Sequence, residues 1–397
     1  MAKRIAVIGG GVCGLVFAKR VMEHVRRNEA QLEVTLISKD EYHYMPAFFT
    51  DVAFGDAEPD DTRAPLKDIA ERIGVRLLLD RVVKVDPDNN SLVLEKNGPL
   101  SYDYLVVCMG TRYGWDEYPG LSSAYNNYSL EDALKMRDAL AGFNGGEVIV
   151  LVPEFPYRCP GYAFEVAAKL LTLARRRGVV EKTRVKLLYP IPLDQAMQRF
   201  FDVARSVMEI HGLLGHVEYY FGAKLDRVEP SEKKIYLKSG EGFKYDILIA
   251  TPPPRPPRPL EETPLVWKED PRFIETSFPT FRSPKYDNVF IPTDGALPSI
   301  HMVFAGVPVH YAAASVADTI ASEVAGKVTG ENPFPETLTF FLDFGITGGI
   351  VGFDVKPAGG GKASIKPYMA LTHPFLKLVK YSFYKSWINA LKLQVHL

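Results

Sequence analysis

The sequence contains little cysteine and no excess of charge, and each shortage excludes a class of protein. Its 397 residues include only three cysteines, Cys13, Cys108 and Cys159. These are too few and too scattered for a disulfide framework, and no CxxC pair indicates a metal site, so we expect no metal. The formal net charge is -1, so no overall basic field favours nucleic acid as a partner.

We also expect no leader segment. Lys3 to Ile8 leads directly into glycines, without the charged segment and apolar run of a signal peptide. We therefore expect the protein on the cytoplasmic face of the cell membrane, bound peripherally, or in the cytoplasm. The stretch from Gly295 to Ala317 has no charged residue, but its prolines and histidines favour a buried loop and helix over a transmembrane span.

The first motif in the sequence is a dinucleotide-binding motif at the N-terminus. Arg4 to Ile8 predicts a strand, a helix follows to about Arg27, and the GxGxxG spacing between them is formed by Gly9, Gly11 and Gly14. The first glycine allows the tight turn, the second admits a pyrophosphate, and the third lets the helix pack on the strand. We expect Cys13, within this turn, to be a small packed residue.

The next predicted strand, Glu33 to Ile37, should end in an acidic residue that binds the adenosine ribose. The sequence has Ser38 and Lys39 there instead, and a hydroxyl can also bind a ribose. Further on, a small β insert is predicted from three strands, Arg76 to Leu79, Val82 to Val85 and Ser91 to Leu94.

Two later strands resemble the other FAD signatures of flavoproteins with two dinucleotide domains. Tyr102 to Thr111 is an apolar strand that ends in Gly110-Thr111, with Cys108 expected in the core. Asn288 to Gly295 ends in Asp294, which in such proteins binds the ribityl chain. Together with the glycine motif, these signatures indicate FAD rather than NAD in the first domain.

Between these signatures, Glu147 to about Ala250 predicts a second α/β unit. Its strands are expected at 148–152, 185–189 and 247–250, with helices at 163–177 and 195–211. The turn after the first strand carries Pro153, Pro156, Cys159 and Pro160 and has no glycine between Val150 and Pro160, so we do not expect NAD(P)H to bind. The proline-rich stretch at 251–264 predicts a rigid return loop without a ligand.

Several segments of the chain resemble the sulfide:quinone oxidoreductase and flavocytochrome c sulfide dehydrogenase family. The resemblance rests on the glycine motif and on the segments YHYMPAFFTDVAFG, PYRCPGYAFE and GVPVHYAAASVA. It implies that Cys159 is the first active-site cysteine. The family's second cysteine has no counterpart after Cys159, and a third would fall near Tyr128, so the resemblance implies a mechanism with a single thiol.

The resemblance also assigns roles to other residues. Cys159 would be a thiolate stabilised by a helix start and by Arg158, or else a structural remnant. Glu165 would be the acid/base, or an exposed helix glutamate. Val307 and Pro308 would pass beneath the flavin, with His310 as a polar partner or a buried structural residue.

The C-terminal third resembles the family's quinone-binding part. Residues 335–354 resemble the strands of the quinone pocket, and the tail predicts a helix with apolar residues at helical spacing and lysines beside them. We expect contacts with quinone or the membrane from Phe344, Phe375, Lys380, Phe383 and Trp387. Such a helix suits a bilayer interface; the alternative is a helix docked on the protein's own core or on a dimer partner.

The sequence thus predicts an α/β fold with two Rossmann-like domains and a C-terminal segment that faces quinone and membrane. The expected boundaries are 1–118 with 285–330 for the FAD domain, 119–284 for the second domain and 331–397 for the C-terminal segment. The expected activity is FAD-dependent oxidation of sulfide, or of a related small sulfur compound, with electron transfer to membrane quinone. The alternatives are a quinone-reducing flavoprotein with another donor and an electron-transfer subunit of a larger assembly; a homo-oligomer is possible.

Overall fold

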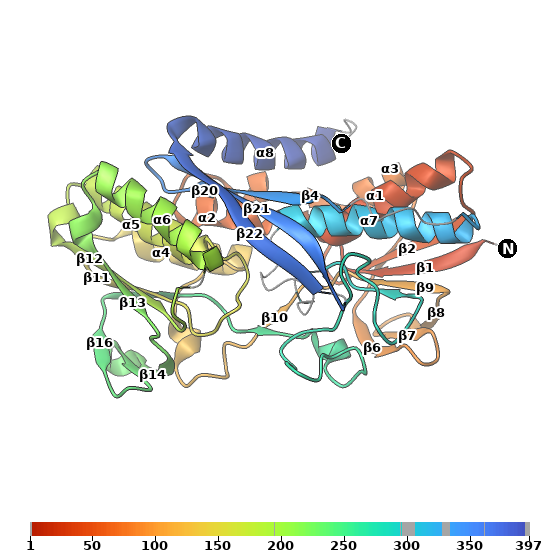
Figure 1. The fold of residues 1–397 in the computed structure, drawn as a ribbon, viewed down its shortest axis with the longest axis horizontal. Coiled ribbons are helices and arrows are strands. Elements are labelled where there is room, and N and C mark those ends of the chain that lie inside the picture. The colour runs from red at the N-terminus through yellow and green to blue at the C-terminus, as the bar shows by residue number, and fades with distance from the viewer. Residues whose placement is uncertain are drawn as a thin grey trace.

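Two parallel sheets lie side by side in the computed structural model, which describes residues 2–193, 195–293, 295, 306–327, 334–360 and 362–393 (Figure 1). The first sheet has the order β19-β9-β1-β2-β5. Its strands are Val289–Phe290 (β19), Tyr104–Val107 (β9), Lys3–Ile8 (β1), Leu32–Ser38 (β2) and Arg76–Leu79 (β5). Helices Val12–Arg26 (α1) and Gly306–Val324 (α7) pack against each other on one face of this sheet.

The second parallel sheet has the order β13-β12-β11-β17. Its strands are Val217–Phe221 (β13), Thr183–Tyr189 (β12), Gly146–Leu151 (β11) and Ile247–Ala250 (β17), and its helices are Leu130–Ala141 (α4), Tyr162–Arg176 (α5) and Gln195–Ile210 (α6). The two sheets give an α/β fold typical of two dinucleotide-binding domains. The predicted domain boundaries stay predictions.

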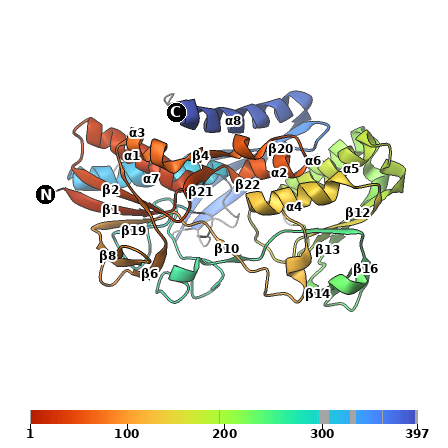
Figure 2. The ribbon, with the colours of Figure 1, turned by 180° about the vertical axis from the view of Figure 1, so that it is seen from behind.

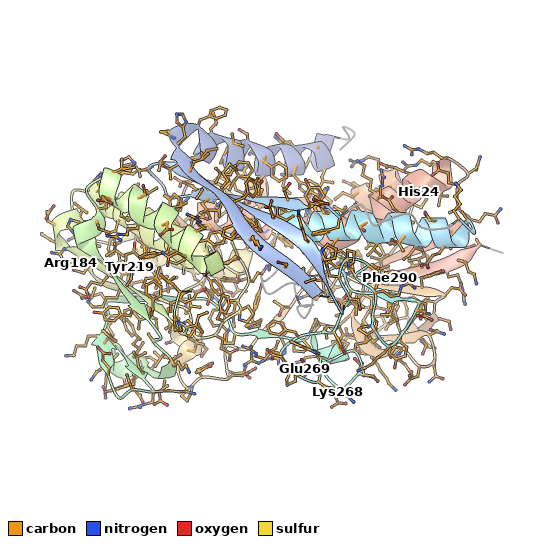
Figure 3. All side chains as sticks on the ribbon, in the orientation of Figure 1. His24, Arg184, Tyr219, Lys268, Glu269 and Phe290 are labelled. Atoms are coloured by element: carbon orange, nitrogen blue, oxygen red, sulfur yellow. A yellow bond between two sulfur atoms is a disulfide. The ribbon has the colours of Figure 1, made fainter. Side chains whose placement is uncertain are left out.

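Small sheets decorate the two units at the edge of the molecule opposite the C-terminal helix, where the exposed side chains of Lys268 and Glu269 also lie (Figure 3). They comprise Val82–Asp86 (β6), Ser91–Leu94 (β7) and Gly98–Ser101 (β8) on the first unit, and Leu225–Glu229 (β14), Lys234–Leu237 (β15) and Gly242–Lys244 (β16) on the second. The prediction that residues 76–79 belong to the small insert was wrong. These residues form β5, whose partner is β2 of the main sheet.

A third layer lies across the junction of the two units (Figures 1 and 2). An antiparallel sheet is formed by Thr337–Asp343 (β20), Gly348–Gly359 (β21) and Lys362–His373 (β22), and Pro374–Leu393 (α8) covers it. The remaining elements are Phe49–Ala53 (α2), Leu66–Ile73 (α3), Tyr42–Tyr44 (β3), Arg63–Pro65 (β4), Arg112–Tyr113 (β10) and Pro254–Arg255 (β18). The layer formed by β20, β21, β22 and α8 places the C-terminal part of the chain against the turns of both parallel units.

The uncharged stretch near residue 300 is described by the structure mainly in its second half. Its second half forms α7, whose Ala312, Val316 and Ile320 are fully buried, while residues 296–305 lie outside the described part of the chain. Among the described residues, no helix combines the length and apolar character needed to cross a bilayer. The predicted buried helix is therefore confirmed for residues 306–317.

Candidate active site

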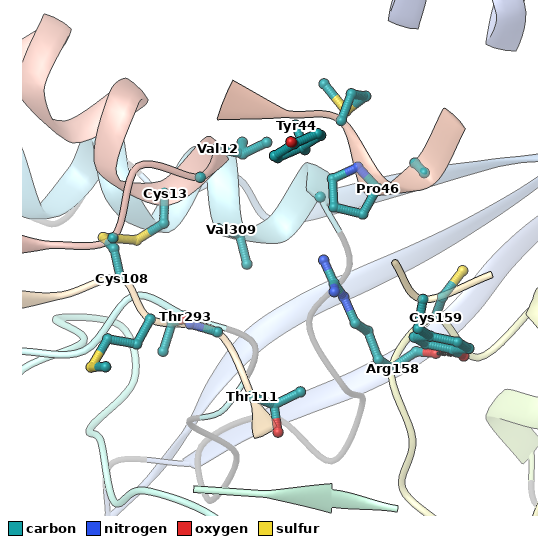
Figure 4. Close-up of a pocket in the computed structure, with 18 of the residues that line it drawn as sticks. Val12, Cys13, Tyr44, Pro46, Cys108, Thr111, Arg158, Cys159, Thr293 and Val309 are labelled. Carbon is teal, nitrogen blue, oxygen red and sulfur yellow. Dashed lines mark hydrogen bonds between the residues drawn. A yellow bond between two sulfur atoms is a disulfide. The ribbon is translucent and has the colours of Figure 1, made fainter. Parts of the chain in front are cut away.

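A large cavity, about 1330 Å³ in volume, lies where the three layers meet (Figure 4). Its walls come from the turn after β1, the ends of β2 and β9, the turn before α5, the start of α7, strand β20 and helix α8. Segments that are far apart in the sequence therefore line one site.

The turn after β1 fits a dinucleotide. A Cβ added at Gly9 would collide with the Cys108 carbonyl, and one at Gly14 would collide with the Gly9 carbonyl, so both positions need glycine for backbone packing. Gly11 is different, because an added Cβ would have no described protein atom within 4 Å. No side chain caps the start of α1, which leaves its first N–H groups open to a phosphate.

The other predicted FAD residues surround this turn. Ser38 and Lys39 line the cavity, although the buried Ser38 hydroxyl donates to the Asp40 carbonyl at 2.9 Å. The Gly110 N–H donates to Thr293 Oγ1 at 2.9 Å, and the Thr111 hydroxyl donates to the Arg255 carbonyl at 2.8 Å.

At the start of α7, Val307 lines the cavity, whereas Pro308 is buried behind it. Asp294 lies outside the described residues. The residues present around the glycine turn thus suit FAD, with a role for Asp294 left as a prediction.

Cys13 and Cys108 form a single disulfide, a pairing that the sequence analysis did not predict. Both residues are buried, as predicted, and both also line the cavity. Their Cα atoms are 5.4 Å apart because β1, which leads into α1, pairs in parallel with β9. A separation of 95 residues hides this proximity from a reading of the sequence.

Cys159 lies on the opposite side of the cavity from that disulfide (Figure 4). Its φ of 65° is in the left-handed region, which a non-glycine residue adopts at a cost. The Tyr128 hydroxyl donates to the preceding carbonyl, that of Arg158, at 2.9 Å, and Arg158 Nη1 donates to the Tyr113 hydroxyl at 2.7 Å. The position expected for a further family cysteine therefore holds a tyrosine that fixes the thiol-bearing loop.

The predicted thiolate at Cys159 was wrong for the free protein. Helix α5 begins only at Tyr162, and burial, followed by the Glu165 carboxylate, raises the pKa of the Cys159 thiol to about 11. Lys380 and Arg158 lower this pKa by less than burial and Glu165 raise it. At neutral pH the side chain is therefore a thiol, and a neighbouring base must accept its proton before the sulfur can react as a thiolate.

Glu165 is not an exposed helix glutamate. It is 4% exposed, lines the cavity and accepts a hydrogen bond from the Lys380 ammonium of α8, which is 6% exposed. Burial raises the pKa of Glu165, despite the opposing effect of Lys380. Burial alone would lower the pKa of Lys380, but Glu165 raises it overall, so the lysine is charged. A carboxyl group with a raised pKa beside a thiol suits proton transfer.

A second buried charge cluster, which the sequence reasoning missed, lies one helical turn further along α5. Lys169 Nζ is 3.0 Å from an Asp51 oxygen, 3.2 Å from Asp56 and 2.6 Å from Asp343. These carboxylates lie close enough together to hold a metal ion, but the Lys169 ammonium already lies among them, and Arg176 and Lys377 each lie 3.8 Å from one of them. The signal in the sequence was a lysine four residues after Glu165 in an otherwise apolar stretch.

The predicted quinone residues separate into three groups. Lys380, Phe383 and Trp387 line the cavity. Phe344 is fully buried and lies outside the cavity lining, whereas Phe375 is 60% exposed on the outer surface of α8.

Helix α8 docks on the protein's own core through Ile388 and Leu391. Its lysines bind protein groups: Lys377 Nζ donates to the Gly345 carbonyl at 2.8 Å, and Lys385 contacts Asp61. Lys377 and Lys385, which we expected beside the apolar residues of this helix, thus bind protein groups.

His43 links α8 to the glycine turn and was also missed. Its Nδ1 lies 3.1 Å from the Gly10 carbonyl, and the Trp387 indole N–H donates to its Nε2 at 3.1 Å. Donation from Nδ1 and acceptance at Nε2 require the neutral ring, and burial lowers the pKa of His43 to about 4, which agrees. The segment YHYMPAFF signalled family resemblance without showing this contact.

His310, at the start of α7, also faces the cavity. It is partly buried, lines the cavity, and its ring centre lies 5.7 Å from that of Trp387. Burial lowers the pKa of His310. Both readings of this residue, a polar partner of the flavin and a structural histidine, remain compatible with this position.

The proline-rich stretch forms part of the cavity wall, so it is more than a return loop. Its Pro254 and Arg255 pair with β10, and 257–259 line the cavity. Arg255 also holds the turn after β11, because its Nη1 and Nη2 each lie 2.9 Å from a Glu154 oxygen. Arg272 Nη1 lies 3.2 Å from the same carboxylate.

Comparison with known proteins agrees with this geometry. Residues 3–152 match the family model described as pyridine nucleotide-disulphide oxidoreductase. The chain is 24% identical over 299 residues to the mitochondrial sulfide:quinone oxidoreductase of Mus musculus and 26% identical over 300 residues to that of Dictyostelium discoideum. Each match covers 72% of this chain and 64% of the relative, so it spans less than two thirds of the relatives' length.

Among solved structures, the sulfide:quinone oxidoreductase of Aquifex aeolicus superposes with a TM-score of 0.82 at 19% identity, covering 99% of this chain and 92% of that one. This likeness confirms the fold. The matches together define a flavoprotein of the pyridine nucleotide-disulphide oxidoreductase class. Within that class, the chain is similar to sulfide:quinone oxidoreductases, which agrees with the resemblance found in its sequence.

Proposed function

We propose that the protein is an FAD-dependent oxidoreductase that oxidises sulfide, or a related small sulfur compound, and passes two electrons to membrane quinone. One observation carries the proposal: the same cavity is lined by the glycine turn, by Cys159 and by the Glu165–Lys380 pair. The enzyme class is common to the family. The substrate and the acceptor are part of the proposal.

Bound FAD would supply the two-electron acceptor, held by the turn after β1 and by the ends of β2 and β9. Oxidation of hydrosulfide then joins its sulfur to Cys159. One S–S bond forms, one proton stays on the resulting persulfide, and two electrons and one proton leave to the flavin. The balance starts from a neutral Cys159 thiol, which is the form that burial favours.

Glu165 would act on the proton of Cys159 because its carboxyl group is buried beside the thiol and its pKa is raised. Lys380 holds that carboxyl group through the ion pair. Because Lys380 comes from α8 and Glu165 from α5, which follows the turn bearing the thiol, the pair would connect the sulfur side of the cavity with the quinone side.

Quinone would reach the cavity past α8. Large apolar side chains are exposed on β22 and α8, namely Tyr368, Leu371, Phe375, Leu378 and Phe383. Such a patch suits a bilayer interface, which would bring a membrane quinone to Phe383 and Trp387. A peripheral position on the cytoplasmic face of the membrane is part of the proposal.

Anaerobic spectroscopy on the purified, FAD-loaded protein tests the function. We expect the flavin absorbance to bleach with sulfide, to stay unchanged with NADH, and to return when a soluble quinone analogue is added. Bleaching by NADH with full quinone turnover would contradict the proposal, as would a flavin that sulfide does not reduce.

A second candidate is a quinone-reducing flavoprotein with a donor other than sulfide. It is favoured by the finding that, among the described residues lining the cavity, Cys159 is the only cysteine outside the disulfide. Replacing Cys159 by serine separates the candidates. Unchanged turnover of the physiological donor in Cys159→Ser would favour the second, and loss of turnover would favour the first.

A further inference from the structure

The three segments predicted to bind FAD meet at the Cys13–Cys108 disulfide. Cys13 belongs to the glycine turn, Cys108 follows β9, and Cys13 Sγ lies 3.2 Å from the carbonyl of Pro292, which follows β19. The Cys108 N–H also donates to the Ile8 carbonyl at 2.8 Å. The disulfide thus joins two of these three segments covalently, on the side of the cavity where FAD is predicted to bind.

Both cysteines of this link also line the cavity. The link lies directly behind the turn whose Gly11 faces open space, which is where a pyrophosphate would lie. A bound dinucleotide would therefore lie between the disulfide and a reductant in the cavity. Without the dinucleotide, Cys13 and Cys108 are 4% and 6% exposed and line the cavity, so a small reductant in the cavity can reach the disulfide only through this narrow exposed surface.

We propose that Cys13–Cys108 is a redox-modification site that controls how firmly the protein retains its dinucleotide. The inference rests on the proposed binding of FAD. A dithiol cleaves the S–S bond, supplies two electrons and two protons to give two thiols, and becomes a disulfide itself. The reduced chain then holds the glycine turn against β9 by backbone hydrogen bonds and packing alone.

The physical basis is the size of the loop that the disulfide closes. A link across 95 residues removes much conformational freedom from the opened chain. Its loss makes local separation of α1 from β9 easier, and that separation distorts the turn on which the pyrophosphate would rest. FAD binding and the arrangement in which the glycine turn is held against β9 favour each other. Bound FAD should therefore protect the disulfide from reduction.

The test uses full-length, FAD-loaded protein with the Cys159→Ala substitution, so that the third thiol does not react. Samples with and without dithiothreitol are compared for the rate of FAD release, by flavin fluorescence, and for the melting temperature. The state of the cysteines is verified by mass analysis after alkylation. We expect FAD release to become about tenfold faster and the melting temperature to fall by about 5 °C on reduction.

The Cys13→Ala/Cys108→Ala variant in the same background is the matched control. It should release FAD at the fast rate from the start and show no response to dithiothreitol. Equal FAD release before and after verified reduction would overturn the inference, as would two free thiols in protein purified without reductant. Protein that takes up no FAD before any treatment would instead contradict the proposed function, and the inference with it.

Discussion

The turns after β1 and after β11 occupy the same place in two similar parallel units, yet they present different chemistry. After β1, three glycines lead into α1 within four residues, and the turn offers backbone N–H groups. After β11, ten residues intervene before α5, with three prolines that have no N–H and with the thiol of Cys159. One scaffold therefore presents an open glycine turn in one unit and a proline-rich turn with a thiol in the other.

Charge increases the difference between the two turns. A carboxylate, Glu154, follows β11 and is held by Arg255 and Arg272, whereas the described residues of the turn after β1 carry no acidic side chain. The open N–H groups of the first turn favour a phosphate, whereas in the second turn Glu154 already engages Arg255 and Arg272 and its carboxylate offers a phosphate no donor. The comparison thus explains why we expect FAD in the first unit and no NAD(P)H in the second.

The largest effect should follow removal of the thiol from the second turn. We expect Cys159→Ser to slow flavin reduction by sulfide by ~10³-fold or more, because the nucleophile is lost. The FAD content should match that of the wild type, because the first turn is intact. Stopped-flow absorbance with a flavin count per protein measures both, and sulfide-dependent reduction at the wild-type rate would refute the assignment.

The next largest effect should follow from breaking the buried ion pair between Glu165 and Lys380, which lies beside the second turn. Lys380→Met leaves the Glu165 carboxylate buried without a partner, which should lower the free energy of unfolding by about 3–5 kcal/mol. Lys377→Met is the matched control on the same helix: this lysine is 29% exposed, and we expect a loss of about 1 kcal/mol or less. Urea denaturation compares the two, and equal losses would contradict the structural role of the pair.

A smaller effect should follow from the open glycine of the first turn. Gly11→Ala adds a Cβ that meets no described protein atom within 4 Å, so the protein should fold normally while FAD affinity falls about tenfold. Gly142→Ala, at a site with equally open surroundings after α4, should leave affinity unchanged. Titration of apoprotein with FAD gives both values. Unchanged affinity in Gly11→Ala would place the pyrophosphate elsewhere.

The smallest effect concerns the protonation of Cys159. Because its pKa is raised to about 11, the thiolate fraction is minor at neutral pH and grows tenfold with each unit of increasing pH. Alkylation by iodoacetamide, measured by mass analysis between pH 7 and 9.5, should therefore accelerate tenfold per unit without levelling. A plateau near pH 8 would indicate an ordinary or activated thiol.

The local features of both turns could be predicted from the sequence. Gly9, Gly11 and Gly14 fall between a strand and a helix as the motif requires, and α5 was expected at 163–177 and occurs at Tyr162–Arg176. These features depend on neighbouring residues, since turn residues and helical periodicity are local signals.

The features that arise from packing between distant segments could not be predicted. The Cys13–Cys108 bond requires β1 and β9 to be neighbours, and the Glu165–Lys380 pair joins residues 215 positions apart. The state of Cys159 follows from burial by several elements, so a sequence rule based on helix starts gave the wrong protonation. Likewise, β5 could join the main sheet only through its pairing with β2.

The most direct test of the contrast between the turns is mass analysis of the peptide that contains Cys159, after anaerobic sulfide titration of the FAD-loaded protein. We predict one added sulfur atom on Cys159, appearing in step with loss of the oxidised flavin absorbance, and no added sulfur on Cys13 or Cys108. Complete reduction of the flavin by sulfide with Cys159 unmodified would contradict the assignment of the second turn as the sulfur site.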